Sequence, residues 1–512
     1  MSGPVRATAV SVGALLAERA SQAPLRNAFI EGRSGRTVNW RQLEETAGCW
    51  RTFRQVPARL PSTRVGLAIA DPVVAAASFL AALGCGVTVA PLDGEAPPGQ
   101  LLEHIEQLHL GALVTDSTDG QLLDAAAASG VAVWSPGIDD LHLLRAGLRP
   151  RPGAPATSAA LIMATSGTSG TPKIVPLAER QLVATATAVA GHHHITSQDC
   201  GYCPLPLFHI NGLVVGVLST LVAGSTLVVE RRFSRRTFWP TVARYRVTWL
   251  NLVPAIIGVL SQSKGPTQAQ TPHVRFARSA AAPLPVATAT LFERRSGVAV
   301  LETYGMTEAA SQIAANPLRR SERRPGSVGK PVGIDLRVVD HTRRPVPPGT
   351  AGDVEIRGER VVSEYWAIND SRPAWPATDG DGWLATGDVG FVDDDGFLYL
   401  LARADDVINR GGEKIYPGEI EDVLLGDARV TGAVVVGRAH SVAGTEPVAF
   451  VTTSALVTER AALVDDLRGR CAEMLSRSKR PADVTVVDIL PAGPTGKVRR
   501  AELRRQLAGA AR

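Results

Sequence analysis

TSGTSGTPK, residues 165–173, brings together threonine and serine hydroxyls, two glycines, a proline and a lysine. Glycine lets the backbone turn tightly, so that backbone N–H groups can approach an anion closely. The hydroxyls add short hydrogen-bond donors, and Lys173 adds a positive charge. This composition indicates a loop that binds phosphate.

The stretch does not fit the P-loop pattern G-x-x-x-x-G-K-[ST], in which a hydroxyl residue after the lysine binds Mg²⁺. Lys173 follows a proline and precedes Ile174. A flexible linker would have a similar composition, but the apolar run ALIMA (160–164) predicts a buried strand directly before the loop. A strand that leads into a Gly/Ser/Thr turn is a common phosphate site of α/β proteins.

On both sides of this stretch, up to about residue 340, the chain alternates β-branched runs with Ala- and Leu-rich runs. TRVGLAIA (63–70), followed by DPVVAAASFLAALG (71–84), is one such pair. This alternation predicts an α/β fold with mainly parallel sheets. From about residue 325, short strands separated by Gly, Asp and Pro predict a small β-barrel. Two strands, a helix and a last strand then predict a small α+β domain, which gives expected domains of residues 1–403 and 404–512.

The composition excludes several classes of protein. Hydrophobic residues make up 45% and charged residues 20% of the chain, as in soluble globular proteins. The net charge of +5 is mild for 512 residues, and the basic runs at 231–236 and 319–324 lack the aromatic pattern of a nucleic-acid platform. The uncharged stretch 201–229 contains prolines and glycines, which favours a buried helix and a strand over a membrane span.

The cysteines indicate a reducing compartment. There are five, an odd number, at scattered positions, which argues against a disulfide framework. We therefore expect a cytoplasmic protein.

ETYGMTEAA (302–310) places three functional side-chain types within five residues. The ring of Tyr304 could stack on a base. Glu308, beside the hydroxyl of Thr307, could bind Mg²⁺, which prefers oxygen ligands and phosphate oxygens. Alone, this motif is weak, because tyrosine and glutamate are common in loops.

Two further stretches are equally weak when taken singly. In GWLATGDVG (382–390), Asp388 follows a glycine turn and could accept both hydroxyls of a ribose, although aspartate is also a common turn residue. In PAGPTGKVRR (491–500), Lys497 lies in a Gly-flanked loop that could deliver positive charge to a reacting centre, or could simply be part of a basic tail.

In this order and at these separations, the four motifs resemble those of the ANL superfamily of adenylate-forming enzymes, which includes acyl-CoA synthetases, adenylation domains and luciferases. The resemblance covers nearly the whole chain. It implies a large N-terminal domain of two mainly parallel sheets and a barrel, followed by a small C-terminal domain that rotates between two half-reactions. It also implies ATP and Mg²⁺, and CoA as the usual thiol acceptor. We expect a monomer or a homodimer.

The resemblance assigns the ATP site residue by residue. Tyr304 would lie on the adenine, and Asp388 would take the ribose hydroxyls with Arg403 nearby. The β- and γ-phosphates would be held by Thr165, Ser166, Gly167, Thr168 and Lys173.

The same resemblance assigns the reacting groups and the hinge. Glu308 would bind Mg²⁺, and Thr307 would contact the α-phosphate. Lys497 would be the lysine that adenylation needs. Asp405 would be the hinge, and the Gly411–Gly412 turn would line the approach of the second nucleophile after rotation.

The acid pocket most resembles that of the peroxisomal-type CoA ligases, which include oxalate–CoA ligases. The resemblance rests on PLFHINGL (206–213), VRFARSAAAPL (274–284) and NRGGEKIYPGEIE (409–421). In that group a histidine and a serine contact a small acid, which matches His209 and Ser279. Arg278 could pair with a second carboxylate, or could be structural. The remaining expected pocket residues are Ala280, Gly305 and Met306.

The chain departs from the family pattern at Ala280, Glu364, Ala402 and Ser478, and the C-terminal changes concern the acceptor more than adenylation. Three interpretations stay open. The first is an acid–CoA ligase for a small dicarboxylic or aromatic acid. The second is an adenylating enzyme with a non-thiol acceptor, such as one that activates nitrite for transfer to an aryl amine. The third, a non-catalytic nucleotide-binding protein, is disfavoured by the presence of Glu308, Asp388 and Lys497.

GHHHITSQDCGYCPLPLFH (191–209) suggests zinc, because three histidines precede Cys200-x₂-Cys203. We discount this interpretation, because a structural site usually needs two spaced pairs and consecutive histidines point in different directions. His192–His194 are instead expected to be exposed or to cap a helix.

Overall fold

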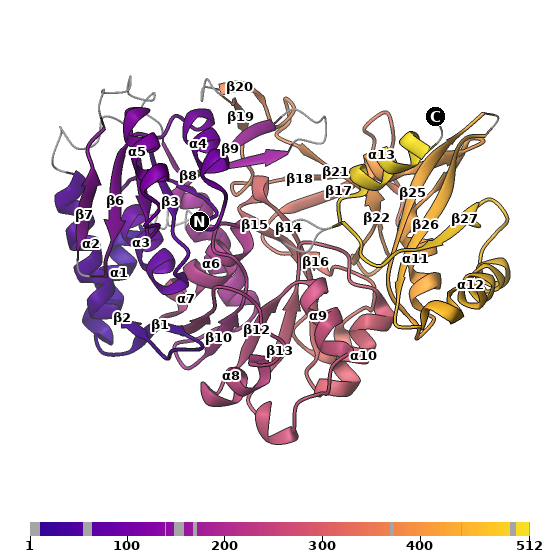
Figure 1. Cartoon of the computed structure of the whole chain (residues 1–512), viewed down its shortest axis with the longest axis horizontal. Coiled ribbons are helices and arrows are strands. Elements are labelled where there is room, and N and C mark those ends of the chain that lie inside the picture. Colours follow the sequence, from indigo (N-terminus) through magenta and orange to yellow (C-terminus); the bar gives the residue numbers. More distant parts are fainter. Residues whose placement is uncertain are drawn as a thin grey trace, which may run out of the picture.

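The computed structural model describes residues 11–54, 64–138, 140–147, 158–166, 172–368, 373–441, 443–491 and 498–510. Figure 1 shows a large N-terminal part built on sheets and helices, and a smaller C-terminal part beside it. Among the described residues, no helix is long and apolar enough to cross a membrane.

The first large sheet has nine strands, parallel in its middle and antiparallel at its ends. In spatial order they are β16 (Lys330–Pro331), β15 (Ser311–Ala315), β14 (Val300–Met306), β13 (Phe276–Ser279), β12 (Trp249–Leu252), β10 (Cys200–Cys203), β11 (Thr226–Val229), β1 (Asn27–Glu31) and β2 (Thr37–Asn39).

The second large sheet also has nine strands and the same parallel centre. In spatial order they are β20 (Pro373–Pro376), β19 (Glu364–Ala367), β9 (Pro172–Ala178), β8 (Ala159–Ser166), β4 (Thr88–Pro91), β3 (Arg64–Ala68), β5 (Ala112–Thr115), β6 (Ala132–Pro136) and β7 (Leu141–Arg145). The predicted α/β class with mainly parallel sheets is therefore confirmed.

One hydrophobic core joins the two sheets through the helices that pack against them. Helix α3 (Pro72–Gly84) is buried along nearly its whole length, as its uninterrupted apolar sequence requires. Asp71 caps its N-terminus by accepting the N–H groups of Val73 and Val74. The other helices of the large part are α1 (Val12–Gln22), α2 (Trp40–Arg54), α4 (Pro98–Gln107), α5 (Gly120–Ala128), α6 (Glu179–His192), α7 (Ser219–Ala223), α8 (Phe238–Arg244), α9 (Pro254–Ser261) and α10 (Val286–Ser296).

The segment predicted as a small barrel folds as a four-stranded antiparallel sheet. Its strands, in order, are β17 (Asp335–Val339), β18 (Gly352–Arg357), β21 (Leu384–Val392) and β22 (Leu398–Arg403). Strands β17 and β22 are its edges. Strand β22 leads into a single 3₁₀ turn, η5 (Ala404–Asp406), which connects the large part to the small one.

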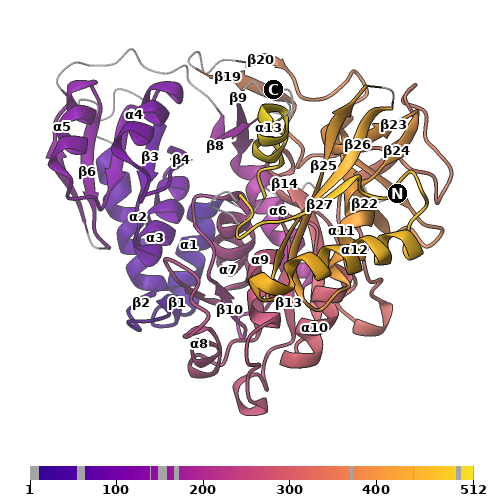
Figure 2. The same ribbon diagram turned by 45° about the vertical axis from the view of Figure 1, so that its right-hand side comes forward.

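The C-terminal part has its own sheet and its own cores (Figure 2). Side chains alternate across a strand, and accordingly Val435 faces one core while Val434 and Val436 face the other. The strands are β24 (Glu413–Ile415), β23 (Ile408–Arg410), β26 (Gly444–Thr453), β25 (Val430–His440) and β27 (Asp483–Val486). The helices are α11 (Pro417–Leu425) and α12 (Arg460–Met474) at one core and α13 (Arg500–Ala510) at the other.

The uncharged stretch 201–229 folds as expected, except in its helix type. It forms β10, a buried helix and β11. The helix begins as the π-helix η1 (Asn211–Leu218) before continuing as α7, and sequence periodicity did not predict that widening. π-Turns occur frequently at functional sites, and the first residue of this helix, Asn211, contacts Arg278 in the cluster described below.

The histidine run ends helix α6, and His193 is its C-cap residue, in agreement with the prediction that these histidines are exposed or cap a helix. That residue follows the last helical residue and is fully buried, with its ring edge-on to Phe276. Its exposed neighbour His194 takes a left-handed φ of 49° that ends the helix. Cys200 and Cys203 lie at the two ends of β10, where residues three apart face opposite sides of the sheet.

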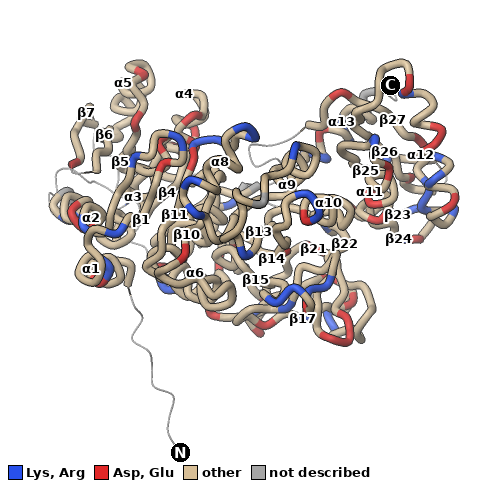
Figure 3. The backbone as a smooth tube through the Cα atoms, turned by 90° about the horizontal axis from the view of Figure 1, so that it is seen from below, with Lys and Arg blue, Asp and Glu red and all other residues tan. Residues whose placement is uncertain are grey.

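The basic run at 231–236 lies on the surface and is partly neutralised. Arg231 and Arg232 both pair with Glu95, which lowers the pKa of that carboxyl group although burial works against the shift. Figure 3 shows Lys and Arg interspersed with Asp and Glu over both parts of the molecule.

Candidate active site

The functional side chains gather at the carboxyl ends of the parallel strands β12, β13 and β14. Their register places Asn251 beside Arg278 and Ser279 beside Glu302. The hydroxyl of Thr303 donates to the Ser279 carbonyl oxygen over 3.1 Å, which ties the two strand ends together. This edge of a parallel sheet is where α/β proteins bind ligands.

A first cluster joins Tyr304 to Asp388 and Arg403. Asp388 and Arg403 lie directly opposite each other on β21 and β22, and Arg403 Nη1 donates to Asp388 Oδ1 over 2.9 Å. The other carboxylate oxygen accepts the hydroxyl of Tyr304. Burial and the Asp388 charge raise the pKa of Tyr304 well above its ordinary value, so its hydroxyl keeps its proton and donates. The structure thus brings together the three residues expected at the nucleoside.

A second cluster surrounds Lys173, the last residue of the stretch 165–173. Its Nζ lies 3.1 Å from Glu308 Oε1 and 3.5 Å from the ring centroid of Tyr365. The hydroxyl of Tyr365 also donates to Glu308, over 3.3 Å. The side chains of Lys173 and Glu308 are only 16% and 9% exposed, so this cation and this anion are largely withdrawn from water.

The loop that would hold phosphate joins two antiparallel strands, not a strand and a helix as in a P-loop. Thr165 on β8 is the register partner of Lys173 on β9, and Thr165 Oγ1 is buried without a partner. Gly167 and Thr168 lie outside the described residues, and for Ser166 only the backbone is described.

The turn that carries Glu308 is tight. After the 3₁₀ turn η3 (Thr307–Ala309), Ala310 and Ser311 take positive φ values of 52° and 110°, which side-chain-bearing residues rarely adopt. The chain then folds back as β15 so closely that a Cβ on Gly305 would lie 1.9 Å from the Ser311 carbonyl oxygen. Gly305 is therefore required by the backbone itself, whatever contact it makes with a substrate.

A third cluster surrounds Arg278, which is 1% exposed. Its hydrogen-bond partners among the described side chains are neutral amides: Nη1 donates to Asn211 Oδ1 over 2.9 Å and to Asn251 Oδ1 over 3.2 Å. Nη2 donates to Gln312 Oε1 over 3.5 Å. Burial without a carboxylate partner lowers the pKa of Arg278 to about 9, so the guanidinium is still charged at neutral pH.

Several buried polar atoms of this cluster and of the predicted pocket residues have no partner among the described residues. Folded proteins satisfy nearly all such atoms, so a group of them in one place indicates a ligand site. Those on the predicted residues and their neighbours are His209 Nε2, Asn211 Nδ2, Arg278 Nε, Ser279 Oγ and Gln312 Nε2. Burial lowers the pKa of His209 to about 4, although Asp93 acts in the opposite direction, so this imidazole is neutral at pH 7.

The remaining predicted pocket residues lie close by in the chain. Ala280 is buried directly after Ser279, and Met306 is half-buried at the end of β14. Lys497 lies outside the described residues.

Two residues of the site were missed from the sequence. Tyr365 comes from β19, whose pairing with β9 brings it to Lys173. Gln312 reaches Arg278 only because β15 folds back along β14. A tyrosine in SEYW and a glutamine in SQIAA have no local feature that marks them as functional.

The site suits Mg²⁺ bound together with phosphate. Among the described residues, no cluster of three or more His, Cys, Asp or Glu side chains could hold a metal ion alone. Mg²⁺ is commonly bound through one or two carboxylates plus substrate phosphates. Glu308 supplies a buried carboxylate beside Lys173, the residue expected at the phosphates.

Sequence comparison finds similar proteins that are named as acid–CoA ligases. The chain is 37% identical to the sulfoacetate–CoA ligase of Cupriavidus necator, over 96% of this chain and 97% of the relative. It is 33% identical to an oxalate–CoA ligase of Arabidopsis thaliana, over 80% of this chain and 76% of the relative.

Solved structures show the same fold. ATP-bound MatB from Rhodopseudomonas palustris superposes with a TM-score of 0.84 at 27% identity, covering 98% of this chain and 100% of that one. o-Succinylbenzoate coenzyme A synthetase (MenE) from Bacillus subtilis, in complex with ATP and magnesium ion, superposes with a TM-score of 0.78 at 27% identity, over 96% and 99% of the two chains.

Family-level comparison covers both parts of the molecule. Residues 16–366 match the AMP-binding enzyme family, and residues 419–497 match the AMP-binding enzyme C-terminal domain. The chain therefore belongs to the AMP-binding enzymes, the adenylate-forming superfamily to which its sequence motifs point.

Proposed function

We propose that the protein is an ATP-dependent, AMP-forming acid–CoA ligase whose acid is small and carries a second anionic group, such as another carboxylate or a sulfonate. The observation that supports this most strongly is the buried guanidinium of Arg278. It is held by three neutral amides, and no described carboxylate neutralises it. A charge withdrawn from water is costly unless it is paired, and an anionic group of the substrate would pair with it.

The relatives support the same class of acid. Sulfoacetate and oxalate are small acids with two anionic groups, and they are named as the substrates of two of the similar proteins. Ser279 and the neutral His209 would hydrogen-bond to such an acid with atoms that have no partner in the protein. Arginine would take the distal group through its planar fork.

In the first step, a carboxylate oxygen of the acid attacks the α-phosphorus of ATP and pyrophosphate leaves. Tyr304 and Asp388 would hold the nucleoside, and Lys173 the outgoing phosphates. Thr307 would donate to the α-phosphate, and Lys497 would stabilise the developing negative charge. Mg²⁺, held by Glu308, would neutralise phosphate charge when bound.

In the second step, the thiol of CoA attacks the acyl carbon and AMP leaves. The Gly411–Gly412 turn, expected to line the approach of the thiol, is exposed, and a side chain at either residue would meet nothing within 4 Å. The second step therefore requires another domain orientation. We place the boundary between residues 403 and 404, with the hinge at Asp405.

The test is release of AMP and pyrophosphate with Mg-ATP across a panel of acids, with and without CoA. The panel contains sulfoacetate, oxalate, malonate, acetate, benzoate and nitrite. We expect turnover with an acid that has two anionic groups, stimulated by CoA. Turnover with acetate or benzoate alone would contradict the proposed acid class. Turnover only with nitrite and an added aryl amine would contradict the CoA-ligase assignment.

A further inference from the structure

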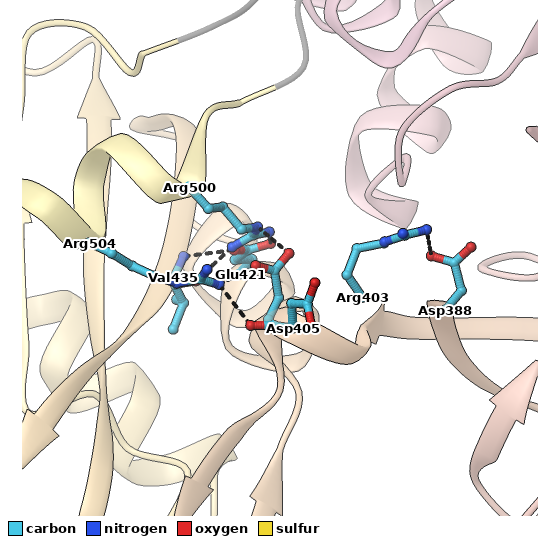
Figure 4. Close-up of polar contacts among 8 residues, drawn as sticks. Asp388, Arg403, Asp405, Glu421, Val435, Arg500 and Arg504 are labelled. Atoms are coloured by element: carbon cyan, nitrogen blue, oxygen red, sulfur yellow. Dashed lines mark hydrogen bonds and ion pairs between the residues drawn. The ribbon is translucent and has the colours of Figure 1, made fainter. Parts of the chain in front are cut away.

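The connection between the two parts of the molecule is held at both ends by arginines (Figure 4). It runs from Arg403, the last residue of β22, through the turn η5 to β23. Only Ala404 and Asp405 of this connection are exposed, whereas Arg403 and Asp406 are half-buried.

On the N-terminal side, Arg403 is fixed to the sheet from which it comes. Its Nη1 donates to Asp388 Oδ1 over 2.9 Å and to the Thr386 carbonyl oxygen over 3.1 Å. Both acceptors lie on the adjacent strand β21, and Asp388 is the register partner of Arg403. The N-terminal rigid body therefore extends to residue 403.

On the C-terminal side, two arginines of α13 converge on Asp406. Arg504 Nη2 pairs with its carboxylate and also donates to the Asp405 carbonyl oxygen over 3.2 Å. Arg500 Nε lies 3.5 Å from the other carboxylate oxygen. The Asp406 side chain is only 19% exposed, so these contacts are partly shielded from solvent.

Arg500 is itself fixed in the C-terminal domain. Its two terminal nitrogens donate to the two oxygens of Glu421, on α11, over 2.7 and 3.0 Å. Nη1 also donates to the Val435 carbonyl oxygen on β25, over 2.6 Å, and Glu421 accepts the Val435 N–H. Burial acts to lower the pKa of Arg500, but Glu421 and Asp406 raise it above the ordinary value. Such forked pairs are directional, so α11, α13, β25 and Asp406 form one unit.

We infer that Arg500 and Arg504 are positioning residues that confine the rotation between the two half-reactions to Ala404 and Asp405. The inference rests on the proposed function, because only a two-step reaction requires the rotation. A hinge is a few residues that absorb a large change in φ and ψ. With Asp406 tied to one domain and Arg403 to the other, few torsions remain free, and each orientation of the C-terminal domain is better defined.

The hinge also adjoins the nucleotide site. Asp388, which anchors Arg403, is the carboxylate expected to take the ribose hydroxyls, and it also accepts the hydroxyl of Tyr304. A bound nucleotide would therefore act directly on the N-terminal anchor of the hinge, while Arg500 and Arg504 maintain the other side.

The test variant is Arg504→Met, which keeps much of the side-chain length but removes the charge. Its matched control is Arg505→Met, because Arg505 is the adjacent arginine on α13 and is exposed. Single-turnover rates would be measured for acyl-adenylate formation without CoA, and for thioester formation from the preformed adenylate.

We expect Arg504→Met to slow both half-reactions by about 10-fold per active site, because the reacting groups are misplaced more often. The KM for ATP should be unchanged, since the ATP contacts are expected from the N-terminal domain. Arg504→Lys, which can still pair with Asp406, should restore most of the rate. Rates per active site equal to those of Arg505→Met, or no recovery with lysine, would overturn the inference.

A second readout does not depend on activity. Endoproteinase Asp-N cuts before aspartate, so it can cleave both the Ala404–Asp405 bond and the Asp405–Asp406 bond, and the products of the two cuts differ in mass. Arg504→Met frees this segment and keeps Asp406, which the protease recognises. Asp406→Asn would also free the segment, but it removes that recognition residue and is therefore unsuitable. Cleavage of the Asp405–Asp406 bond should therefore be about 10-fold faster in Arg504→Met than in Arg505→Met.

Equal cleavage rates in Arg504→Met and Arg505→Met would overturn the inference. If the unmodified protein made no thioester with any acid, the proposed function would fail. The protease comparison would still report on the arginine contacts at the hinge, so the two failures are distinguishable.

Discussion

The surroundings of Arg278 indicate the charge of the ligand that this site would bind. A buried cation surrounded by neutral amides is a poor contribution to stability, because its desolvation is not offset by an opposite charge. An anionic ligand bound beside the guanidinium would offset this desolvation cost. The same residue is therefore expected to affect activity much more than stability.

Replacing Arg278 with methionine tests this expectation. Arg278→Met should change the melting temperature little, because removal of a buried, unneutralised charge offsets the loss of its hydrogen bonds to three amide oxygens. It should lower kcat/KM for the dianionic acid by about 100-fold, because a charged pair is lost from a desolvated site. Activity with the matching monocarboxylic acid should fall much less. Equal losses with both acids, measured by pyrophosphate release, would show that Arg278 only maintains the fold.

His209 gives a prediction about pH. Burial lowers its pKa from 6.5 to about 4, so the folded protein keeps it neutral while the unfolded chain takes up a proton first. Its contribution to stability is therefore present above pH 6.5 and is lost as the pH falls toward 4. The free energy of unfolding, measured with denaturant, should fall less over this pH range in His209→Gln than in the unmodified protein. The exposed His273→Gln is the control and should keep the original slope.

At the scale of elements, the active site depends on how β14 turns into β15. Ala310 and Ser311 have positive φ values, and Gly305 lies against the returning strand. This turn aims Glu308 at Lys173, and it brings Gln312 back toward Arg278. A change that separates the two strands should therefore disturb the phosphate and acid contacts together.

Gly305→Ala is the most direct change to this turn, because the new methyl group would overlap the Ser311 carbonyl oxygen. We expect a loss of about 2–4 kcal/mol in the free energy of unfolding, and slower adenylation. Gly258→Ala is the control: a Cβ there meets nothing within 4 Å, and alanine favours a helix. Denaturant midpoints would compare the two. A stable, fully active Gly305→Ala would refute this account of the turn.

The local sequence predicted the helices and strands better than it predicted which of them contact one another. The alternation of strands and helices, the buried segment after residue 201 and the end of α6 are properties of neighbouring residues, and these predictions were confirmed. The π-helical start at Asn211 and the partners Tyr365 and Gln312 were missed. The positions of Tyr365 and Gln312 depend on pairing between segments far apart in the chain, which no local pattern encodes.

On the scale of the whole molecule, one orientation of the C-terminal domain leaves the Gly411–Gly412 turn in solvent. The two-step reaction proposed here needs this turn at the active site only in the second step. The connection at residues 403–406, held by arginines at both ends, is where the change of orientation would occur.

Gly412→Leu separates the two steps. A side chain at residue 412 meets no neighbour here, so adenylation should be retained, whereas thioester formation should fall by about 10-fold or more as the leucine blocks the thiol. Gly396→Leu controls for backbone strain, because Gly396 also has a positive φ and open space around it. Rapid-quench measurement of each half-reaction would decide. Equal loss of both steps in Gly412→Leu would argue against rotation.

In the proposed reaction, an oxygen of the acid attacks the α-phosphorus of ATP. The most direct measurement is therefore the fate of that oxygen, using an ¹⁸O-labelled acid that turns over with Mg-ATP and CoA. We expect one labelled oxygen from each acid molecule to appear in AMP and none in pyrophosphate. Label in orthophosphate with formation of ADP, or AMP without label, would contradict it.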